Sequence, residues 1–367
     1  MSDNNSPTAA APTGTERPQE PGQGAAAETT AASANEDNVA AAAAIAADED
    51  ADDNASLNGG SVARSTSTVA DSIFESRLEN GRTYHKYKDG SMRISESYEI
   101  GQRLIKGIKL IAHKAADIVH NLYLQTFDYA LGTAPPNDEN SNIGRVLDVG
   151  TGTGIWAIEF GEEHTDAEVI GVDLSPSQPQ FVPPNVRFEI DDIEEPWAFS
   201  EPFDYIHSRM MKGSIRDWEK FIQSCFDNLT PGGYLELNDV DFFPKSDDDS
   251  IPKDSKLMRA FTLCFEALEK LGSPFEGFSH FESMLTEIGF EDVNVKRFKW
   301  PTNPWPLDKK HKNLGEWNNE NLSPNLDGLL MAPLTRALDM SKAEVHILAM
   351  EARKEINNTS IHAYFDV

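Results

Sequence analysis

Three glycines spaced two residues apart are the clearest chemical signature of this chain. Gly150, Gly152 and Gly154 follow the apolar run 145–149 directly and precede a stretch with helical periodicity. Glycines let a backbone turn sharply and let a ligand approach it closely. A helix that begins at such a turn directs its unpaired N–H groups and positive dipole end toward that ligand. The pattern predicts a binding site for a nucleotide-type cofactor.

Two carboxylates indicate which kind of cofactor this is. Asp148 comes two residues before the first glycine, at the carboxyl end of the predicted strand. A carboxylate there would repel a pyrophosphate but would tolerate a cationic or zwitterionic ligand. Asp173 ends the next apolar run, 168–173, about 20 residues after the last glycine, where a carboxylate commonly binds a ribose diol.

The glycine spacing alone leaves a second interpretation open. Gly152, Gly154 and Ala157 also fit G-x-G-x-x-A, a dinucleotide fingerprint that would indicate an NAD-dependent oxidoreductase. Asp148 disfavours that interpretation, and so does the Pro-Gly-Gly turn at 231–233.

Later segments repeat the pattern of strand followed by turn. A third predicted strand, 186–190, leads into Asp191, Asp192 and Ile193, a fourth spans 203–207, and the turn at 231–233 leads into a fifth. Together with the run from Asp148 to Gly154, these segments resemble the class I S-adenosylmethionine-dependent methyltransferases. The resemblance implies S-adenosyl-L-methionine as the cofactor. It also implies an α/β fold with a Rossmann-like, doubly wound, mainly parallel seven-stranded sheet.

Shorter motifs narrow the resemblance to the fungal LaeA-like methyltransferases, over about residues 74–367. The motifs are Arg82-Thr-Tyr-His-Lys-Tyr-Lys-Asp-Gly90, Ile155-Trp-Ala157, Asp173-Leu-Ser-Pro176, Gln178-Pro179, Val182-Pro-Pro-Asn-Val186, Glu194-Glu-Pro-Trp197, Gly213-Ser-Ile-Arg-Asp-Trp218 and Ile361-His-Ala-Tyr364. The family includes regulators of secondary metabolism and development, some of them associated with velvet-domain proteins. It also includes small-molecule methyltransferases of biosynthetic clusters.

The resemblance assigns roles to the residues around the glycines. Gly150, Gly152 and Gly154 are expected to form the turn beneath the methionine part of the cofactor, and Asp148 is expected to orient that turn. Asp173 is expected to accept hydrogen bonds from both ribose hydroxyls, which the two oxygens of one carboxylate can do at once.

Further residues are expected on the adenine side of the site and as its cover. Leu174 is expected to pack against the adenine, and the Ile193 N–H to meet a ring nitrogen. Asp192 is expected to accept from the adenine amino group, with Asp191 as the competing choice. Tyr84, in the predicted cap, could cover the cofactor, as could Tyr87, or either could simply pack within the cap.

His207 follows the fourth predicted strand and is expected to line the pocket near the sulfonium. Histidine titrates near neutral pH, so His207 is also the weak candidate for a general base. Methyl transfer mainly requires that acceptor and methyl donor be aligned and shielded from water. The sequence therefore leaves the catalytic residues unknown.

Composition bounds the remaining functions. Residues 1–70 are rich in alanine and acids and contain no aromatic residue, so they are predicted to form a disordered acidic tail. The net charge of −29 argues against direct nucleic-acid binding. No apolar run is long enough to span a membrane, and the N-terminus does not resemble a signal peptide. Two cysteines suffice for neither a disulfide framework nor a zinc cluster, so we expect an intracellular protein of the nucleus or cytoplasm with no metal.

The predicted organisation has three parts: a tail at 1–70, a helical cap and linker at 71–140, and the cofactor-binding domain at 141–367. Within the last part, substrate or lid insertions are expected around 242–345. Two helices are expected at 253–289, a strand at 291–300, loops at 301–325, helix from 326 to 356 and a final strand at 360–367.

The leading functional hypothesis is a LaeA-like S-adenosylmethionine-dependent methyltransferase in fungal secondary metabolism or its regulation. It would act on a small-molecule or protein acceptor and could bind a velvet-type partner. One alternative is a small-molecule O-methyltransferase whose acceptor pocket is lined by aromatics between 242 and 317, such as Trp300, Trp305 and Trp317. The other is a cofactor-holding regulatory interaction protein with little catalytic activity.

Overall fold

The computed structural model describes residues 39–40, 76–79, 82–85, 116–273 and 277–367. The predicted disordered tail, the cap before residue 116 and Tyr87 lie outside these residues, apart from three short strands. These strands are β1 (Val39–Ala40), which pairs in parallel with β10 (Val295–Lys296), and the antiparallel pair β2 (Ser76–Glu79) and β3 (Arg82–His85).

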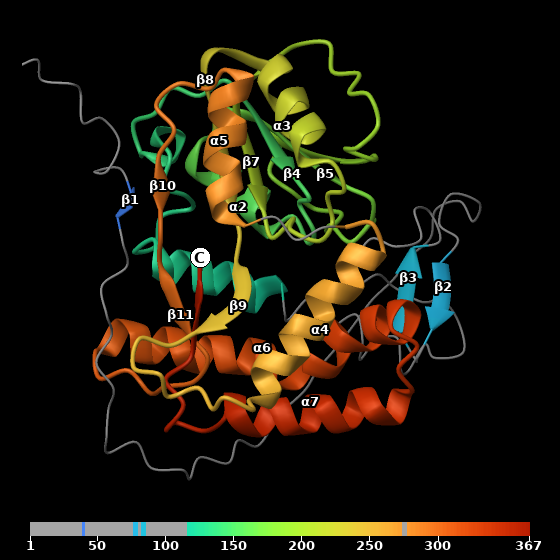
Figure 1. Ribbon diagram of the computed structural model, residues 1–367. Coiled ribbons are helices and arrows are strands. Elements are labelled where there is room, and N and C mark those ends of the chain that lie inside the picture. Colours follow the sequence, from blue (N-terminus) through green and yellow to red (C-terminus); the bar gives the residue numbers. More distant parts are fainter. Residues whose placement is uncertain (1–38, 41–75, 80–81, 86–115, 274–276) are drawn as a thin grey trace, which may run out of the picture. The chain divides into compact units, whose positions relative to one another are not determined.

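Residues 145–238 contain a parallel sheet of five strands (Figure 1). Its order is β6-β5-β4-β7-β8, and every neighbouring pair is parallel. The bounds are β4 Arg145–Val149, β5 Glu168–Asp173, β6 Val186–Ile190, β7 Phe203–Arg209 and β8 Leu229–Asn238. From β4 the chain adds β5 and β6 on one side and then β7 and β8 on the other. This change of side is the doubly wound arrangement that was predicted.

Helices cover both faces of this sheet. Side chains of β4 alternate between two cores, with Val146 in one and Leu147 in the other. On the first face packs α2 (Ile155–Glu163), and on the second packs α3 (Trp218–Asp227), with α5 (Phe278–Ile288) against it. The strands β4 and β5 are buried on both faces and carry mostly apolar residues, which made them recognisable in the sequence.

A second group of helices shares a separate core (Figure 1). It comprises α4 (Lys256–Lys270), α6 (Lys309–Ala337) and α7 (Lys342–Ile356), which contact one another. The helical residues 116–126 add Ile118, Leu122 and Tyr123 to this core. After residue 126 the chain turns, since Asp128 and Tyr129 have positive φ, and it reaches a short 3-10 helix, η1 (Pro135–Asn137).

The expected seven-stranded sheet is present only in part within the described residues. The strands β9 (Asp241–Lys245), β11 (Lys299–Pro301) and β12 (Tyr364–Asp366) form a separate antiparallel sheet in the order β11-β12-β9. The chain leaves the parallel sheet at Asp239, whose carboxylate accepts from the N–H groups of Lys212 and Val240. The final strand therefore pairs with β9 instead of β8.

Two local predictions differ from the structure in instructive ways. The region 301–325 is not all loop, because α6 begins at Lys309, where the Asp308 side chain accepts from the N–H of His311. The prolines at 301, 304 and 306 precede this helix and do not interrupt it. The predicted strand 291–300 is divided into β10 and β11. None of the described helices is both long enough and apolar enough to cross a membrane.

Candidate functional site

The glycine turn joins the carboxyl end of β4 to the first residue of α2. All three glycines have the left-handed φ that the motif predicted, at 72°, 57° and 80° for Gly150, Gly152 and Gly154. Two of them also lie against neighbouring side chains. A Cβ on Gly150 would come within 2.3 Å of the Met211 Sδ, and one on Gly154 within 2.3 Å of the Phe188 Cζ.

Gly152, the middle glycine, is different because the space beside it is open. A Cβ there would meet nothing closer than a backbone oxygen at 4.0 Å. Its N–H donates to the Asp173 Oδ2 at 3.0 Å. The next residue, Thr153, has a buried hydroxyl without a hydrogen-bond partner among the described residues. An open glycine in the left-handed region, beside an unpaired hydroxyl, fits a turn that binds a ligand with its backbone.

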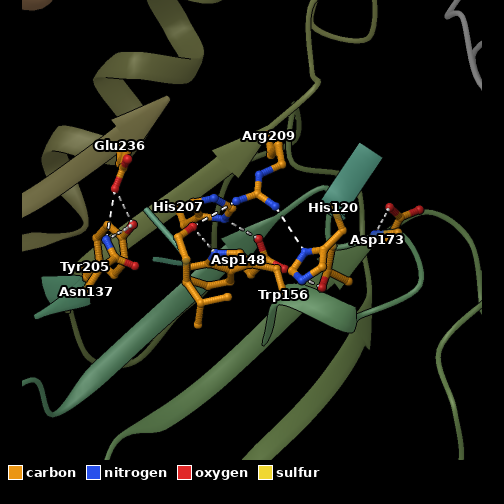
Figure 2. Close-up of polar contacts among 12 residues, drawn as sticks. His120, Asn137, Asp148, Trp156, Asp173, Tyr205, His207, Arg209 and Glu236 are labelled. Carbon is orange, nitrogen blue, oxygen red and sulfur yellow. Dashed lines mark hydrogen bonds and ion pairs between the residues drawn. The ribbon is translucent and has the colours of Figure 1, made fainter. Parts of the chain in front are cut away.

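Asp173 lies at the end of β5 and faces the turn (Figure 2). Its Oδ2 accepts from Gly152, and its Oδ1 accepts from the Ser175 N–H at 2.9 Å. Each carboxylate oxygen has two lone-pair directions, so both oxygens keep one for a further donor. The side chain is half-buried, and its position is compatible with the predicted ribose contact.

Asp148 and His207 form a buried pair beneath the turn (Figure 2). They are register partners on β4 and β7, and the His207 Nδ1 lies 2.7 Å from the Asp148 Oδ1. The other carboxylate oxygen accepts from the Thr151 hydroxyl at 2.6 Å. Asp148 thus contacts the turn from below through Thr151, as expected of a residue that orients it.

The His207 side chain is buried, and one face of its ring is covered. Its side chain has no exposed surface, and the Trp156 ring stacks on it with centroids 3.7 Å apart. Burial lowers the pKa of His207, and the neighbouring Asp148 works against that shift. Trp156 thus covers one face of the ring, and the placement of His207 near the sulfonium or as a general base stays a prediction. The sequence could not show that Trp156 covers it.

A second polar chain joins the sheet to the helical residues 116–126 (Figure 2). Arg209, at the end of β7, donates to the His120 Nδ1 at 3.2 Å and to the Leu131 carbonyl at 2.9 Å. Because a guanidinium only donates, His120 must accept at Nδ1 and carry its proton on Nε2, which lies 2.9 Å from Glu159. These polar contacts were not predicted from the sequence, since the residues that make them are far apart in it.

Arg209 is held further by an aromatic face. Its guanidinium carbon lies 4.4 Å from the centroid of the Tyr123 ring. Burial lowers the pKa of Arg209. Together these contacts hold the helical residues 116–126 against the carboxyl edge of the sheet.

Glu236, on β8, binds the linker at residues 133–137. Its carboxylate accepts from the N–H groups of Thr133 and Ala134, from the Asn137 amide and from the Tyr205 hydroxyl (Figure 2). Burial works to raise the pKa of Glu236, but His207 and these hydrogen bonds outweigh it, and the pKa is lowered. The residue closes the linker onto the sheet.

Asp239 and Lys212 lie at the carboxyl ends of β8 and β7. Burial raises the pKa of Asp239 to about 6, although Lys212 and three backbone N–H groups oppose the shift. Burial also lowers the pKa of Lys212, whose Nζ lies 3.7 Å from the centroid of the Phe278 ring. This acid and base are a titratable pair, and Lys212 was not predicted from the sequence.

The residues expected on the adenine side follow β5 and β6. Asp192 is buried and its Oδ1 accepts from the Glu194 N–H at 3.0 Å, whereas Asp191 is exposed. Ile193 is buried in the core beneath α3, and Leu174 is half-buried after β5. Tyr84 lies in β3, and its side chain is outside the described set. The contacts of the residues after β5 and β6 with adenine, and the covering role of Tyr84, stay predictions.

Comparison with known proteins agrees with this geometry. A family described as a methyltransferase domain matches residues 113–295. Methyltransferase pytC of Aspergillus terreus is 34% identical over 82% of this chain and 89% of its own. The secondary metabolism regulator LAE1 of Cochliobolus heterostrophus is 34% identical over 79% and 92%. The protein-methionine methyltransferase laeA of Emericella nidulans is 33% identical over 78% and 73%.

Solved structures are similar at greater distance. A phosphoethanolamine N-methyltransferase of Haemonchus contortus, solved with S-adenosylhomocysteine, is 16% identical with a TM-score of 0.37, over 69% of this chain and 51% of its own. The identity to the fungal proteins extends over most of both chains. The chain therefore belongs to the LaeA-like methyltransferases, and its cofactor is S-adenosyl-L-methionine.

Proposed function

We propose that this methyltransferase holds its cofactor on the turn 150–154 and on Asp173. The observation that carries the proposal is Gly152, which is open on its side-chain face and bonded through its N–H to Asp173. An ordinary strand–helix turn would need neither feature. When bound, S-adenosylmethionine supplies a methyl group already activated on a sulfonium.

The chain's own residues would then bind and orient. The first N–H groups of α2 would meet the methionine carboxylate, since most N–H groups of the turn already have partners, and Asp173 would accept from the ribose. Asp192, with Asp191 as the alternative, and Ile193 would meet the adenine, and Leu174 would pack on it. Asp148 would set the turn through Thr151. His207 would act on Asp148 only.

The enclosed position of His207 bears on the acceptor. Because Trp156 covers one face of that ring and Asp148 binds its Nδ1, we propose that the acceptor reaches its nucleophilic form without His207. A thioether has no proton to lose, and an amine or an already ionised group also meets this condition. The relative in Emericella nidulans is named a protein-methionine methyltransferase, which supports a protein acceptor for this chain as well.

The small-molecule alternative has less support from the aromatic residues. Trp300 and Trp305 are buried, and their indole N–H groups donate to the Thr126 hydroxyl and the Ala363 carbonyl. Both therefore belong to the packed interior and not to an acceptor pocket. We propose a protein acceptor in the control of secondary metabolism. A velvet-type partner and a nuclear or cytoplasmic location stay predictions.

The test is transfer of labelled methyl from S-adenosylmethionine in extracts of the producing fungus. The extract is separated into protein and small-molecule fractions before the enzyme is added. Label in protein, lost with Gly152→Arg, is the expected result. Label only in the small-molecule fraction would overturn the protein acceptor but not the cofactor site. Label in neither would contradict both.

A further inference from the structure

The middle of the glycine turn is held from outside by two side chains. The carbonyl oxygen of Gly152 accepts from the Ser177 hydroxyl at 2.7 Å and from the Gln178 amide nitrogen at 2.7 Å. The Gln178 amide also donates to the Ser175 carbonyl at 3.0 Å. Both side chains belong to the loop that follows β5 and Asp173.

These bonds are the main restraint on the Gly152 peptide. The glycine has no side chain of its own, and the space beside its Cα is open. Gly150 and Gly154, in contrast, are pressed against Met211 and Phe188, so packing fixes the two ends of the turn. With its N–H bonded to Asp173 and both carbonyl lone pairs taken, the middle of the turn is set by polar bonds alone.

We propose that Ser177 and Gln178 are positioning residues that set the Gly152 peptide for the methionine end of the cofactor. The inference rests on the proposed placement of the cofactor. Neither side chain needs to touch the cofactor, since each acts through the Gly152 carbonyl. Both are half-buried in the loop, where a hydroxyl and an amide have no other evident reason to converge on one carbonyl.

Ser177 and Gln178 should affect the binding of the two parts of the cofactor differently. Loosening the turn should weaken contacts with the amino-acid part, while the adenosine part keeps Asp173 and the loop residues beyond β6. S-adenosylhomocysteine carries both parts, whereas 5′-methylthioadenosine lacks the amino-acid part. The ratio of the two affinities therefore reports on the turn alone.

The experiment is calorimetric titration of the full chain with each of these two ligands. The variants are Ser177→Ala, Gln178→Met and their combination, with Ser177→Thr as the conservative replacement that keeps a hydroxyl. We expect the double variant to bind S-adenosylhomocysteine about tenfold more weakly, since each hydrogen bond contributes modestly. We expect the affinity for 5′-methylthioadenosine to change by about twofold or less. Ser177→Thr should restore most of the loss seen with Ser177→Ala.

A matched control comes from Asn185. Its amide nitrogen donates to three carbonyls, those of Gly161, His164 and Ala167, well away from the turn. Asn185→Ala removes the same kind of bond and should lower thermal stability while leaving the affinity ratio unchanged.

Three outcomes would overturn the proposal. An equal loss for both ligands would mean that Ser177 and Gln178 support the whole site without selecting its methionine end. An unchanged affinity for both would mean that the turn does not need them. If the wild-type chain bound 5′-methylthioadenosine and S-adenosylhomocysteine equally poorly, the proposed cofactor site itself would fail, and the role of the two residues with it.

Discussion

Asp148 and His207 lie opposite each other on neighbouring parallel strands and share a 2.7 Å hydrogen bond with almost no access to solvent. The carboxylate binds the glycine turn through Thr151, and the imidazole is covered by Trp156. His207, near the end of a central strand, therefore supports the glycine turn through Asp148 and Thr151. The pair connects the packing of the sheet to the shape of the binding site.

Removing His207 should be costly for the fold. His207→Ala leaves the buried Asp148 charge without its principal partner, and we expect a loss of about 3–5 kcal/mol in the free energy of unfolding. His207→Asn keeps a donor near the Nδ1 position and should lose less. Urea denaturation measures both. His346→Ala is the control, because its 2.7 Å bond to Asp327 is exposed and should contribute at most about 1 kcal/mol. Equal losses at the two histidines would contradict the account.

The same histidine should give the fold a pH dependence. Burial lowers the pKa of His207 from 6.5, so below that pH the unfolded chain binds a proton that the folded chain does not. Stability should therefore fall as the pH drops below about 6.5. His207→Asn should remove that part of the slope. The measurement is the difference in unfolding free energy between wild type and variant at several pH values. A difference that does not vary with pH would exclude this role.

Asp239 should produce a slope of opposite sign. Its pKa is raised from 3.8 to about 6, so between these values the folded chain keeps a proton that the unfolded chain has lost. Stability should then fall as the pH rises through that window, and Asp239→Asn should flatten the slope there. Unfolding free energies of both proteins at about pH 4 and about pH 6, the edges of the window, measure it. An unchanged slope in the variant would show that Asp239 stays ionised in the folded chain across that window.

The two kinds of glycine in the turn should respond differently to alanine. Gly154→Ala adds both backbone strain at φ +80° and a collision with Phe188, so we expect a loss of more than about 2 kcal/mol. Gly152→Ala adds strain only, and about 1 kcal/mol is expected. Thermal unfolding compares them, with Gly232→Ala as a control that has φ +83° and no neighbour within 4 Å. If Gly152→Ala proved the more destabilising, the space beside Gly152 would not be open.

Much of the sheet could be predicted because its signals are local. The runs 168–173 and 186–190 are the strands β5 and β6 with the same bounds, since β5 carries the apolar stretch 169–172, β6 alternates apolar with charged residues, and each ends at a turn. The glycine turn followed for the same reason. The start of α6 was missed because three prolines outweighed the capping Asp308, a signal only one residue long.

The chemistry of the site depended on contacts that no local pattern contains. His207 follows a strand toward the expected pocket, and only the three-dimensional position of Trp156 shows that its ring is covered. Arg209 and His120 come together from segments that are far apart in the chain. Gln178 lay inside a recognised motif and Ser177 directly before it, but their shared target, the Gly152 carbonyl, required the turn to be folded.

The ribose contact can be tested through Asp173. Asp173→Ala should weaken S-adenosylmethionine binding by about 1–3 kcal/mol, the scale of a lost charged hydrogen bond. The variant also frees the Gly152 N–H, so Asp173→Asn, which keeps one acceptor oxygen, should fall between wild type and alanine. Calorimetric titration gives the three affinities. Unchanged binding in the alanine variant would place the ribose elsewhere.

The most direct test of the cofactor site compares two glycines by titration with S-adenosylmethionine. Gly152→Arg fills the open side of the turn, whereas Gly232→Arg puts the same side chain on an equally open, positive-φ glycine at the start of β8. The account predicts that Gly152→Arg abolishes binding while Gly232→Arg binds like wild type, with both variants folded by circular dichroism. Retained binding in the Gly152→Arg protein would contradict the site.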